Sequence, residues 1–132
     1  MLKRILLIDD DKDDAEIFSD ALDEMAIPAE VVHFLDGKQA LQKLNEKELP
    51  PPDIIFLDIN MPQISGWECL RAIKDVAHLG KIPVVMYSTS DFAREGVVPN
   101  DIGAAAFLTK PSDFGELKTK LSSLLQTFTA HR

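Results

Sequence analysis

Polar side chains that could form a reactive site follow four apolar runs of this chain. Asp58 directly follows four apolar residues, and the neighbouring acids Asp9 and Asp10 follow a similar run near the start. Ser88 follows a third run, and Lys110 comes just after a fourth. In a parallel α/β sheet, ligands bind outside the carboxyl ends of the strands. If these runs are such strands, three acids, a hydroxyl and a lysine converge on one edge of a sheet.

This set of side chains has the chemistry of phosphoryl transfer. Three neighbouring carboxylates repel one another unless a pKa rises or a cation lies between them, and Mg²⁺, a hard ion with oxygen ligands, is the simpler solution. A carboxylate beside Mg²⁺, a lysine and a hydroxyl can accept a phosphoryl group, because the positive charges neutralise its oxygens. We expect Asp58 to be ionised at neutral pH and to attack phosphorus without a general base. Ser88 could then donate a hydrogen bond to the resulting aspartyl phosphate.

Five short apolar segments predict the strands that position these side chains. They span roughly residues 3–8, 30–34, 53–57, 83–88 and 105–108. Apolar residues at helical spacing follow most of them, as at Phe18, Leu22 and Met25. Strands that alternate with helices predict a parallel sheet with helices on both faces. We expect the flavodoxin-like α/β fold, with five parallel strands in the order 2-1-3-4-5, which makes the first and third strands neighbours.

Helix boundaries are marked by capping residues. Asp11 precedes the helix expected from Lys12 to Met25, and Ser112 precedes the last helix. Side-chain oxygens at such positions accept hydrogen bonds from the first free N–H groups of a helix. The helix expected between Asp91 and Gly103 is the least regular, because a glycine and a proline interrupt it. Trp67 is expected to be a packing residue at the start of the third helix.

The composition fits one globular domain. The chain has 132 residues, of which 45% are hydrophobic, which suits one core and leaves no room for a second domain. The formal net charge of -8 argues against direct nucleic-acid binding, which needs clustered Lys and Arg. Cys69 is the one cysteine, so no internal disulfide can form. No apolar run approaches the roughly 18 residues of a membrane helix, and we expect a cytoplasmic protein that does not contact a membrane.

Five sequence motifs together resemble the receiver domain of a two-component response regulator. In chain order they are Ile5-Leu6-Leu7-Ile8-Asp9-Asp10-Asp11, Leu57-Asp58-Ile59-Asn60-Met61-Pro62, Gly66-Trp67-Glu68, Ile82-Pro83-Val84-Val85-Met86-Tyr87-Ser88 and Phe107-Leu108-Thr109-Lys110-Pro111. One such motif is weakly specific, whereas five in register are highly specific. The resemblance covers residues 3–128, which predicts a single receiver domain, a tail at 129–132 and no output domain.

The resemblance implies a role for each acid of the predicted edge. Asp58 would be the phosphoacceptor. Asp10 would bind Mg²⁺ directly, and Asp9 would act mainly through a water molecule. Asp58 itself and the backbone carbonyl of Asn60 would complete the protein ligands.

The resemblance also implies a conformational switch. Lys110 would bind the phosphoryl group, and its peptide bond to Pro111 is expected to be cis. Ser88, where the family more often has Thr, would be the switch hydroxyl. Phe107 occupies an aromatic switch position that is often Tyr, and it would turn inward as Ser88 moves toward the phosphoryl group. This movement would shift the face of the fourth helix, fifth strand and fifth helix between two states.

Partners follow from the same resemblance. A histidine kinase or phosphotransfer protein would donate the phosphoryl group, and a downstream protein would bind the face of the fourth helix, fifth strand and fifth helix. We expect self-catalysed transfer with Mg²⁺ and slow self-dephosphorylation, and no further enzymatic activity. The protein would be a monomer or a weak dimer.

Two other functions use some of the same residues. A haloacid-dehalogenase-type phosphatase also forms an aspartyl phosphate beside magnesium, a lysine and a hydroxyl, but its nucleophile ends the first strand in an Asp-x-Asp-x-Thr/Val pattern. Here Asp9-Asp10-Asp11-Lys12-Asp13 lacks the Thr or Val, and no cap domain fits. A receiver-like binding module would never be phosphorylated, although this chain carries every residue of the acceptor site.

Overall fold

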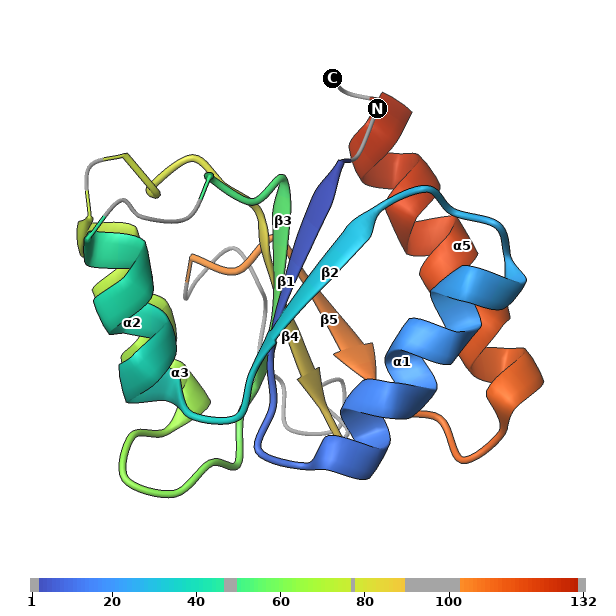
Figure 1. Ribbon diagram of the computed structural model, residues 1–132, viewed down its shortest axis with the longest axis horizontal. Helices are drawn as coiled ribbons and strands as arrows, with labels where there is room; N and C mark the ends of the chain where they lie inside the picture. The colour runs from blue at the N-terminus through green and yellow to red at the C-terminus, as the bar shows by residue number, and fades with distance from the viewer. Residues whose placement is uncertain (1–2, 47–49, 77, 90–102, 131–132) are drawn as a thin grey trace.

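A computed structural model of the chain describes residues 3–46, 50–76, 78–89 and 103–130 (Figure 1). The strands in these ranges are β1 (Arg4–Ile8), β2 (Glu30–Phe34), β3 (Ile54–Asp58), β4 (Val84–Ser88) and β5 (Ala106–Thr109). The helices there are α1 (Lys12–Glu24), α2 (Gly37–Asn45), α3 (Gly66–Asp75) and α5 (Phe114–Ala130). Each strand begins and ends within one residue of its predicted bounds. The helix predicted between Asp91 and Gly103 falls almost wholly outside the described residues.

The strands form one parallel sheet in the order β2-β1-β3-β4-β5, which confirms the predicted flavodoxin-like arrangement (Figure 1). β1 and β3 are neighbours, with Ile8 opposite Leu57. β3 also pairs with β4, which places Asp58 opposite Tyr87. The chain segments that follow Ile8 and Leu57 therefore leave the sheet side by side at its carboxyl edge.

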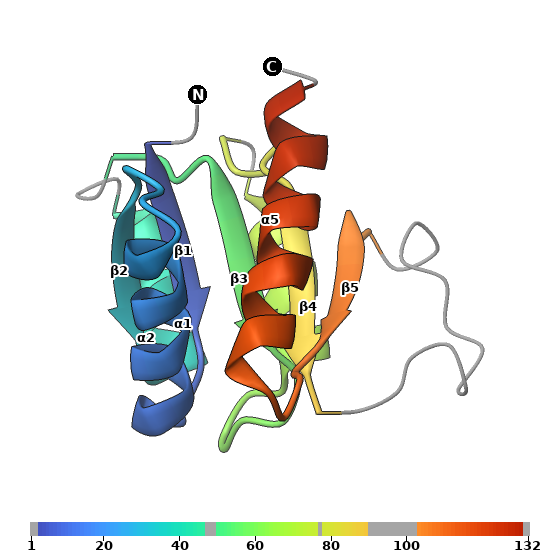
Figure 2. The same ribbon diagram turned by 90° about the vertical axis from the view of Figure 1, so that its right-hand side faces the viewer.

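Helices cover both faces of the sheet, as predicted. Figure 2 shows α1 and α5 in front of the sheet and α2 behind it. On the α1 and α5 side, Phe18 packs edge to face on Phe56, with 4.9 Å between ring centroids. On the α2 and α3 side, Leu70 and Ile73 are buried in the same cluster as Leu57. Because successive strand residues point to opposite faces, β1 and β3 contribute to both cores, which explains why residues 5–8 and 54–57 are all apolar.

Side-chain caps fix the starts of the first and third helices. Asp11 caps α1 as predicted, and its carboxylate accepts hydrogen bonds from the N–H groups of Asp13 and Asp14 at 2.9 and 3.1 Å. Ser65 begins α3 in a reciprocal pair with Glu68. The Glu68 N–H donates to the Ser65 hydroxyl at 3.3 Å, and the Ser65 N–H donates to the Glu68 carboxylate at 3.3 Å. Such a capping box satisfies two helix-end donors at once.

The start of α5 differs from the sequence prediction by one residue. Asp113, and not Ser112, caps the helix, since Asp113 directly precedes the first helical residue and accepts a hydrogen bond from the Glu116 N–H at 3.0 Å. The helix runs through Ala130, two residues past the predicted domain boundary at 128. Among the residues that the structure describes, no helix combines the length and apolar character needed to cross a membrane.

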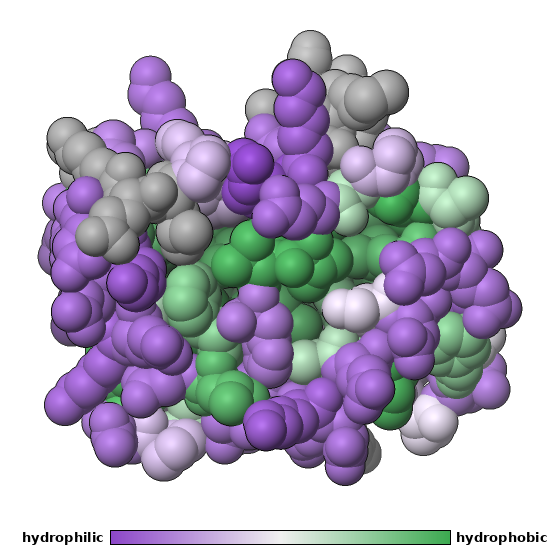
Figure 3. All heavy atoms as spheres, in the orientation of Figure 1, coloured by the Kyte–Doolittle hydropathy of each residue, from purple (hydrophilic) through white to green (hydrophobic). Residues whose placement is uncertain are grey.

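The edge of the sheet at β2 exposes apolar surface. Figure 3, in the orientation of Figure 1, shows apolar side chains near the middle of the visible face, largely surrounded by hydrophilic ones. The residues from Val31 to Phe34 are half-buried, and Leu35, just after the strand, is 37% exposed. Within the described sheet β2 pairs only with β1, so this surface borders its free edge.

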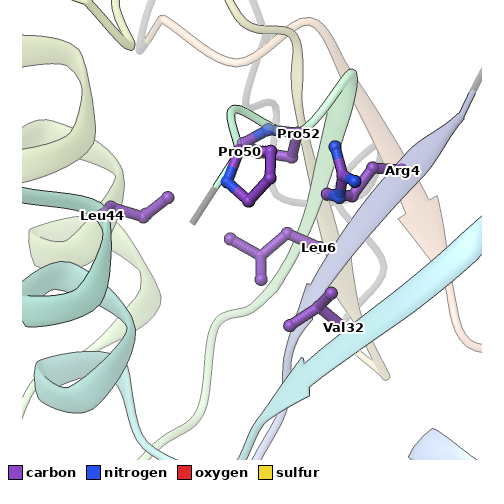
Figure 4. A pocket seen from close by; sticks show the side chains of 6 residues that line it. All are labelled: Arg4, Leu6, Val32, Leu44, Pro50 and Pro52. Carbon is purple, nitrogen blue, oxygen red and sulfur yellow. The ribbon is translucent and has the colours of Figure 1, made fainter. Parts of the chain in front are cut away.

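A small apolar cavity lies at the amino-terminal end of the sheet (Figure 4). It is lined by Arg4, Leu6, Val32, Leu44, Pro50 and Pro52. Because a strand rises about 3.3 Å per residue, roughly 16 Å of β1 separates the start of the strand from its polar end. The cavity is therefore distinct from the edge where the predicted site residues lie, and none of these lining residues is an acid.

Candidate functional site

Three acids meet at the carboxyl edge of β1 and β3, as the sequence predicts. Asp9 follows the last residue of β1, and Asp58 is the last residue of the neighbouring β3. One carboxylate oxygen from each of Asp9, Asp10 and Asp58 lies within 4.8 Å of the others. Asp9 is fully buried and Asp58 is 5% exposed, whereas Asp10 faces solvent. The sheet thus holds two buried acids beside one accessible acid.

Lys110 reaches the same acids from the end of β5. Its Nζ lies 2.9 Å from Oδ2 of Asp9 and 3.7 Å from Oδ2 of Asp58. Asp14 of α1, which is not one of these three acids, also contacts the lysine, with 2.9 Å between its Oδ2 and Nζ of Lys110. The Tyr87 ring lies beneath the lysine, 5.1 Å from Nζ to the ring centroid. The structure therefore places the lysine on the same rim as the acids, and it adds Asp14, which the sequence analysis did not identify.

Ser88 lies at the end of β4, between the positions of the acids and the lysine. It is fully buried, and its strand pairs with β3 such that the preceding residue, Tyr87, lies opposite Asp58. Its backbone carbonyl accepts a hydrogen bond from the Lys110 N–H at 2.7 Å. This bond joins the end of β5 to the end of β4 and fixes where the lysine side chain begins.

Phe107 lies on β5, away from the acids, and packs on α3. Its ring meets that of Trp67 edge to face, with 6.4 Å between centroids and 74° between planes. Both side chains border the buried cluster on the α2 and α3 side of the sheet. Trp67 therefore packs at the start of α3 as predicted, and its partner is the residue predicted to switch.

Burial and charge act against each other on Asp58. Burial raises the pKa of Asp58 most strongly, Lys110 lowers it, and Asp9 raises it further, with the result that it stands at about 7, above the usual 3.8. Without a bound cation, desolvation therefore disfavours the ionised form of Asp58 that was expected at neutral pH. For Lys110, burial lowers the pKa, but the hydrogen bonds that its ammonium group donates to Asp14 and Asp9 outweigh this and hold the pKa above its ordinary value.

The acids fit a Mg²⁺ site by charge, ligand type and spacing. Hard divalent ions bind carboxylate oxygens, and a positive charge between these acids would relieve their repulsion. Asp9 has both oxygens engaged, one by the Asp11 N–H at 3.0 Å and the other by Lys110. Asp10 is exposed, and the Asp58 oxygens have longer contacts, such as the 3.7 Å between Oδ2 and Nζ of Lys110. Asn60, whose backbone carbonyl is the fourth predicted ligand, lies two residues past β3, and its N–H donates to Asp58 at 3.4 Å.

Gly66 allows the segment that carries Asp58 to pass close to the start of α3. A Cβ atom at this position would lie 2.3 Å from the backbone oxygen of Asp58 and 2.5 Å from Cα of Ile59. The Gly66 N–H donates to the Ile59 carbonyl at 2.8 Å. Only a residue without a side chain fits this approach.

His33 supports the backbone of Asp9 from the edge strand β2. Its Nε2 lies 2.8 Å from the Asp9 carbonyl oxygen, so this nitrogen must carry the proton and donate. The Asp9 N–H donates to the Phe34 carbonyl at 3.0 Å. No sequence motif links β2 to the end of β1, so this contact could not be predicted from the sequence.

The expected cis bond between Lys110 and Pro111 was wrong, since this peptide bond is trans. The trans isomer is the intrinsically favoured form of an X–Pro bond, by about 0.5–1 kcal/mol. In this structure the Lys110 N–H and Nζ both find acceptors with the trans bond in place.

Other candidate nucleophiles and ligands lie elsewhere. Cys69 is buried in α3, and burial raises the pKa of its thiol to about 12, which leaves it unreactive. His78 contacts the Leu44 carbonyl at 3.2 Å. A phosphatase nucleophile would correspond to Asp9, the acid at the end of the first strand, but Asp9 is buried with both oxygens hydrogen-bonded.

Comparisons with known proteins agree with this arrangement. The family model of the response regulator receiver domain matches residues 5–122. Response regulator Rcp1 of Synechocystis sp. is 34% identical over 119 residues, which cover 87% of this chain and 81% of that protein. Several curated relatives are longer, and the chain spans about half of their length.

Two solved structures share the fold closely. The phosphorylated cyanobacterial phytochrome response regulator RcpA gives a TM-score of 0.86 at 29% identity, covering 100% of this chain and 97% of that chain. The Mn²⁺-bound form of response regulator Rcp1 gives a TM-score of 0.80 at 29% identity, covering 92% of this chain and 91% of that chain.

Proposed function

The chain belongs to the response regulator receiver family, and from this we propose that Asp58 is the residue that accepts the phosphoryl group. Members of this family are phosphorylation-dependent signalling switches. The observation that carries the proposal is the position of Asp58 at the end of β3, beside Asp9 and Asp10 and 3.7 Å from the Lys110 ammonium.

The proposed transfer forms one bond and breaks another. A carboxylate oxygen of Asp58 attacks the phosphorus of a phosphohistidine on the donor protein. The O–P bond forms as the N–P bond breaks, and the electron pair returns to the imidazole, which takes up a proton from water. Asp58 would attack as the anion, the form that a bound cation favours, so this chain needs no general base. The receiver acts on itself in this step, and we propose slow self-dephosphorylation as its only further reaction.

Each neighbouring side chain has a proposed task in this transfer. Asp9, Asp10, Asp58 and the backbone carbonyl of Asn60 would hold Mg²⁺, which when bound supplies positive charge to the phosphoryl oxygens and favours the ionised form of Asp58. The match to a Mn²⁺-bound relative supports a divalent ion in this family. Lys110 is already aimed at the acids and supplies a second positive charge.

The switch that follows phosphorylation is proposed to run through Ser88 and Phe107. Ser88 donates a hydrogen bond to a phosphoryl oxygen and moves toward it. Phe107 then turns inward and leaves its contact with the Trp67 ring. The surface over β5 and α5, together with the segment between β4 and β5, would change for a downstream protein. A histidine kinase or phosphotransfer protein in the cytoplasm would donate the phosphoryl group.

Acetyl phosphate with Mg²⁺ tests this proposal without a partner protein. The intact mass of the wild-type protein should rise by one phosphoryl group. The Asp58→Asn variant should show no such increase. Asp23→Asn, which changes an exposed acid near the end of α1, is a matched control and should be phosphorylated like the wild type. Labelling of Asp58→Asn at the wild-type rate would contradict the assignment.

A further inference from the structure

Asp14 contacts the site although the proposed transfer gives it no task. It lies in the first turn of α1, and its Oδ2 is 2.9 Å from Nζ of Lys110. The Lys110 side chain is 10% exposed and that of Asp14 is 35% exposed, so the pair is partly shielded from water. This shielding makes the contact stronger than an ordinary surface ion pair.

The contacts of Lys110 are unequal. Its ammonium group lies 2.9 Å from both Asp9 and Asp14, which belong to the segment that follows β1. The Asp58 carboxylate is farther away, at 3.7 Å, and does not form a hydrogen bond with the lysine. Two acids of one segment therefore hold the lysine on the α1 side of the site. Without Asp14, the nearest remaining acids would be Asp9 and Asp58.

We propose that Asp14 is a positioning residue that keeps Lys110 from closing onto Asp58, an inference that rests on the proposed function of Asp58. A lysine bound directly to Asp58 would compete with Mg²⁺ for the same oxygens. It would also withdraw charge from the oxygen that attacks phosphorus. By holding the lysine back, Asp14 leaves the Asp58 carboxylate available for both tasks while the ammonium stays within reach of an incoming phosphoryl group.

Asp13 provides a matched control for this role. It neighbours Asp14 in the same helical turn and carries the same charge, but its side chain is exposed and forms no ion pair with Lys110. Asp13→Asn and Asp14→Asn thus remove the same charge from the same helix end. The difference between them isolates the contact with the lysine.

The experiment measures the Mg²⁺ affinity of the unphosphorylated protein by titration calorimetry and the rate of phosphoryl uptake from acetyl phosphate. Relative to Asp13→Asn, Asp14→Asn should weaken Mg²⁺ binding and slow uptake by about three- to tenfold, the range expected for a coupled, partly exposed pair. In a Lys110→Met background, the two substitutions should have equal effects on Mg²⁺ affinity.

The outcomes separate this inference from the proposed function. If the wild type is phosphorylated on Asp58 but Asp14→Asn behaves like Asp13→Asn, the positioning role is wrong and the acceptor assignment stands. A difference that persists at full size in the Lys110→Met background would also overturn the role, because Asp14 would then act without the lysine. If the wild type takes up no phosphoryl group on Asp58, the proposed function itself fails.

Discussion

Asp58 shows how a single residue can be costly to the fold and useful to the site. Its position at the end of a fully apolar strand buries the carboxylate, and burial disfavours the charge that a nucleophile needs. Lys110 opposes this effect, and Asp9 adds to it. A bound cation would remove the conflict, which is a physical reason for the acids to lie together.

This conflict predicts a pH dependence of stability in the absence of Mg²⁺. The pKa of Asp58 is raised from 3.8 to about 7, chiefly by burial, so the folded protein holds a proton that the unfolded chain has released. The stabilising contribution is complete below the unfolded pKa and is lost as the pH rises toward and through the folded pKa. In EDTA, the free energy of unfolding of the wild type should therefore fall more steeply than that of Asp58→Asn between about pH 5 and about pH 7.5. Equal slopes in urea unfolding would refute the raised pKa.

His33 should stabilise the segment that carries Asp9. Its Nε2–H donates to the Asp9 carbonyl at 2.8 Å. His33→Leu removes this donor and should lower the free energy of unfolding by about 1–2 kcal/mol, since the carbonyl of the buried Asp9 then loses this hydrogen bond. His33→Gln keeps an N–H donor and should recover part of the loss. Chemical denaturation of the wild type and the two variants measures these differences. Equal stability of the wild type and His33→Leu would show that the bond contributes nothing.

At the scale of secondary-structure elements, strand ends determine what the site contains. Buried, largely apolar residues, 5–8 in β1, 54–57 in β3 and 84–87 in β4, lead up to the carboxyl edge, where Asp9, Asp58 and Ser88 lie. The parallel pairing of β1 with β3 and of β3 with β4 brings these ends together. The loop that follows β3 leads to α3, whose first residue, Gly66, permits the close approach of the Asp58 and Ile59 backbone.

Gly66→Ala should therefore destabilise the fold. The new Cβ would meet backbone atoms of Asp58 and Ile59 at 2.3 and 2.5 Å, and backbone cannot move aside as a flexible side chain can. We expect a loss of about 1–3 kcal/mol in the free energy of unfolding. Gly115→Ala in α5 is the control, because its Cβ would meet only the Asp113 carboxylate at 3.2 Å. The control should be neutral or gain up to about 1 kcal/mol, and comparable losses in both variants would argue against the close approach.

The sequence predicts the strands and the polar edge well, because both depend on local pattern. A run of apolar residues ending in Asp58 or Ser88 marks a buried strand and its polar end, and parallel topology then implies that these ends converge. Side-chain contacts between elements have no such signature. The contact of Asp14 with Lys110 depends on the rotation of α1 against the sheet, and the contact of His33 with Asp9 depends on the pairing of β1 with β2.

The predicted start of α5 was wrong because two neighbouring residues suit a helix cap equally well. A serine and an aspartate, Ser112 and Asp113, both suit a helix start, and the structure begins α5 one residue later than expected. The isomer of the Lys110–Pro111 bond is a small free-energy difference that depends on the surrounding loop. The ionisation of Asp58 could not be predicted without knowing how deeply the strand end is buried.

At the scale of the whole molecule, the acid site lies at the carboxyl edge of the sheet, and α3 packs on one of its faces. The strands β4 and β5 connect the two. Ser88 ends β4, and its carbonyl is hydrogen-bonded to the Lys110 N–H at the end of β5. Phe107 lies earlier on β5 and contacts Trp67 on α3. A change at the strand ends can therefore reach α3 through the packing of one aromatic pair.

Trp67 is the only tryptophan in the chain and should report this coupling. If Phe107 turns inward on phosphorylation, the edge-to-face contact at 6.4 Å is lost and the environment of the indole ring changes. We expect acetyl phosphate with Mg²⁺ to change the fluorescence of Trp67 in the wild type, and to change it much less in Phe107→Leu. A fluorescence change of equal size in the two proteins would exclude this route of coupling.

Direct location of the phosphoryl group tests the central assignment. Borohydride reduces an aspartyl phosphate to homoserine, and peptide mass spectrometry then identifies the modified position. After treatment with acetyl phosphate and Mg²⁺, we predict homoserine at position 58 and unmodified aspartate at positions 9, 10 and 14. Homoserine at any of those three positions, with aspartate intact at 58, would contradict the mechanism derived from this sheet edge.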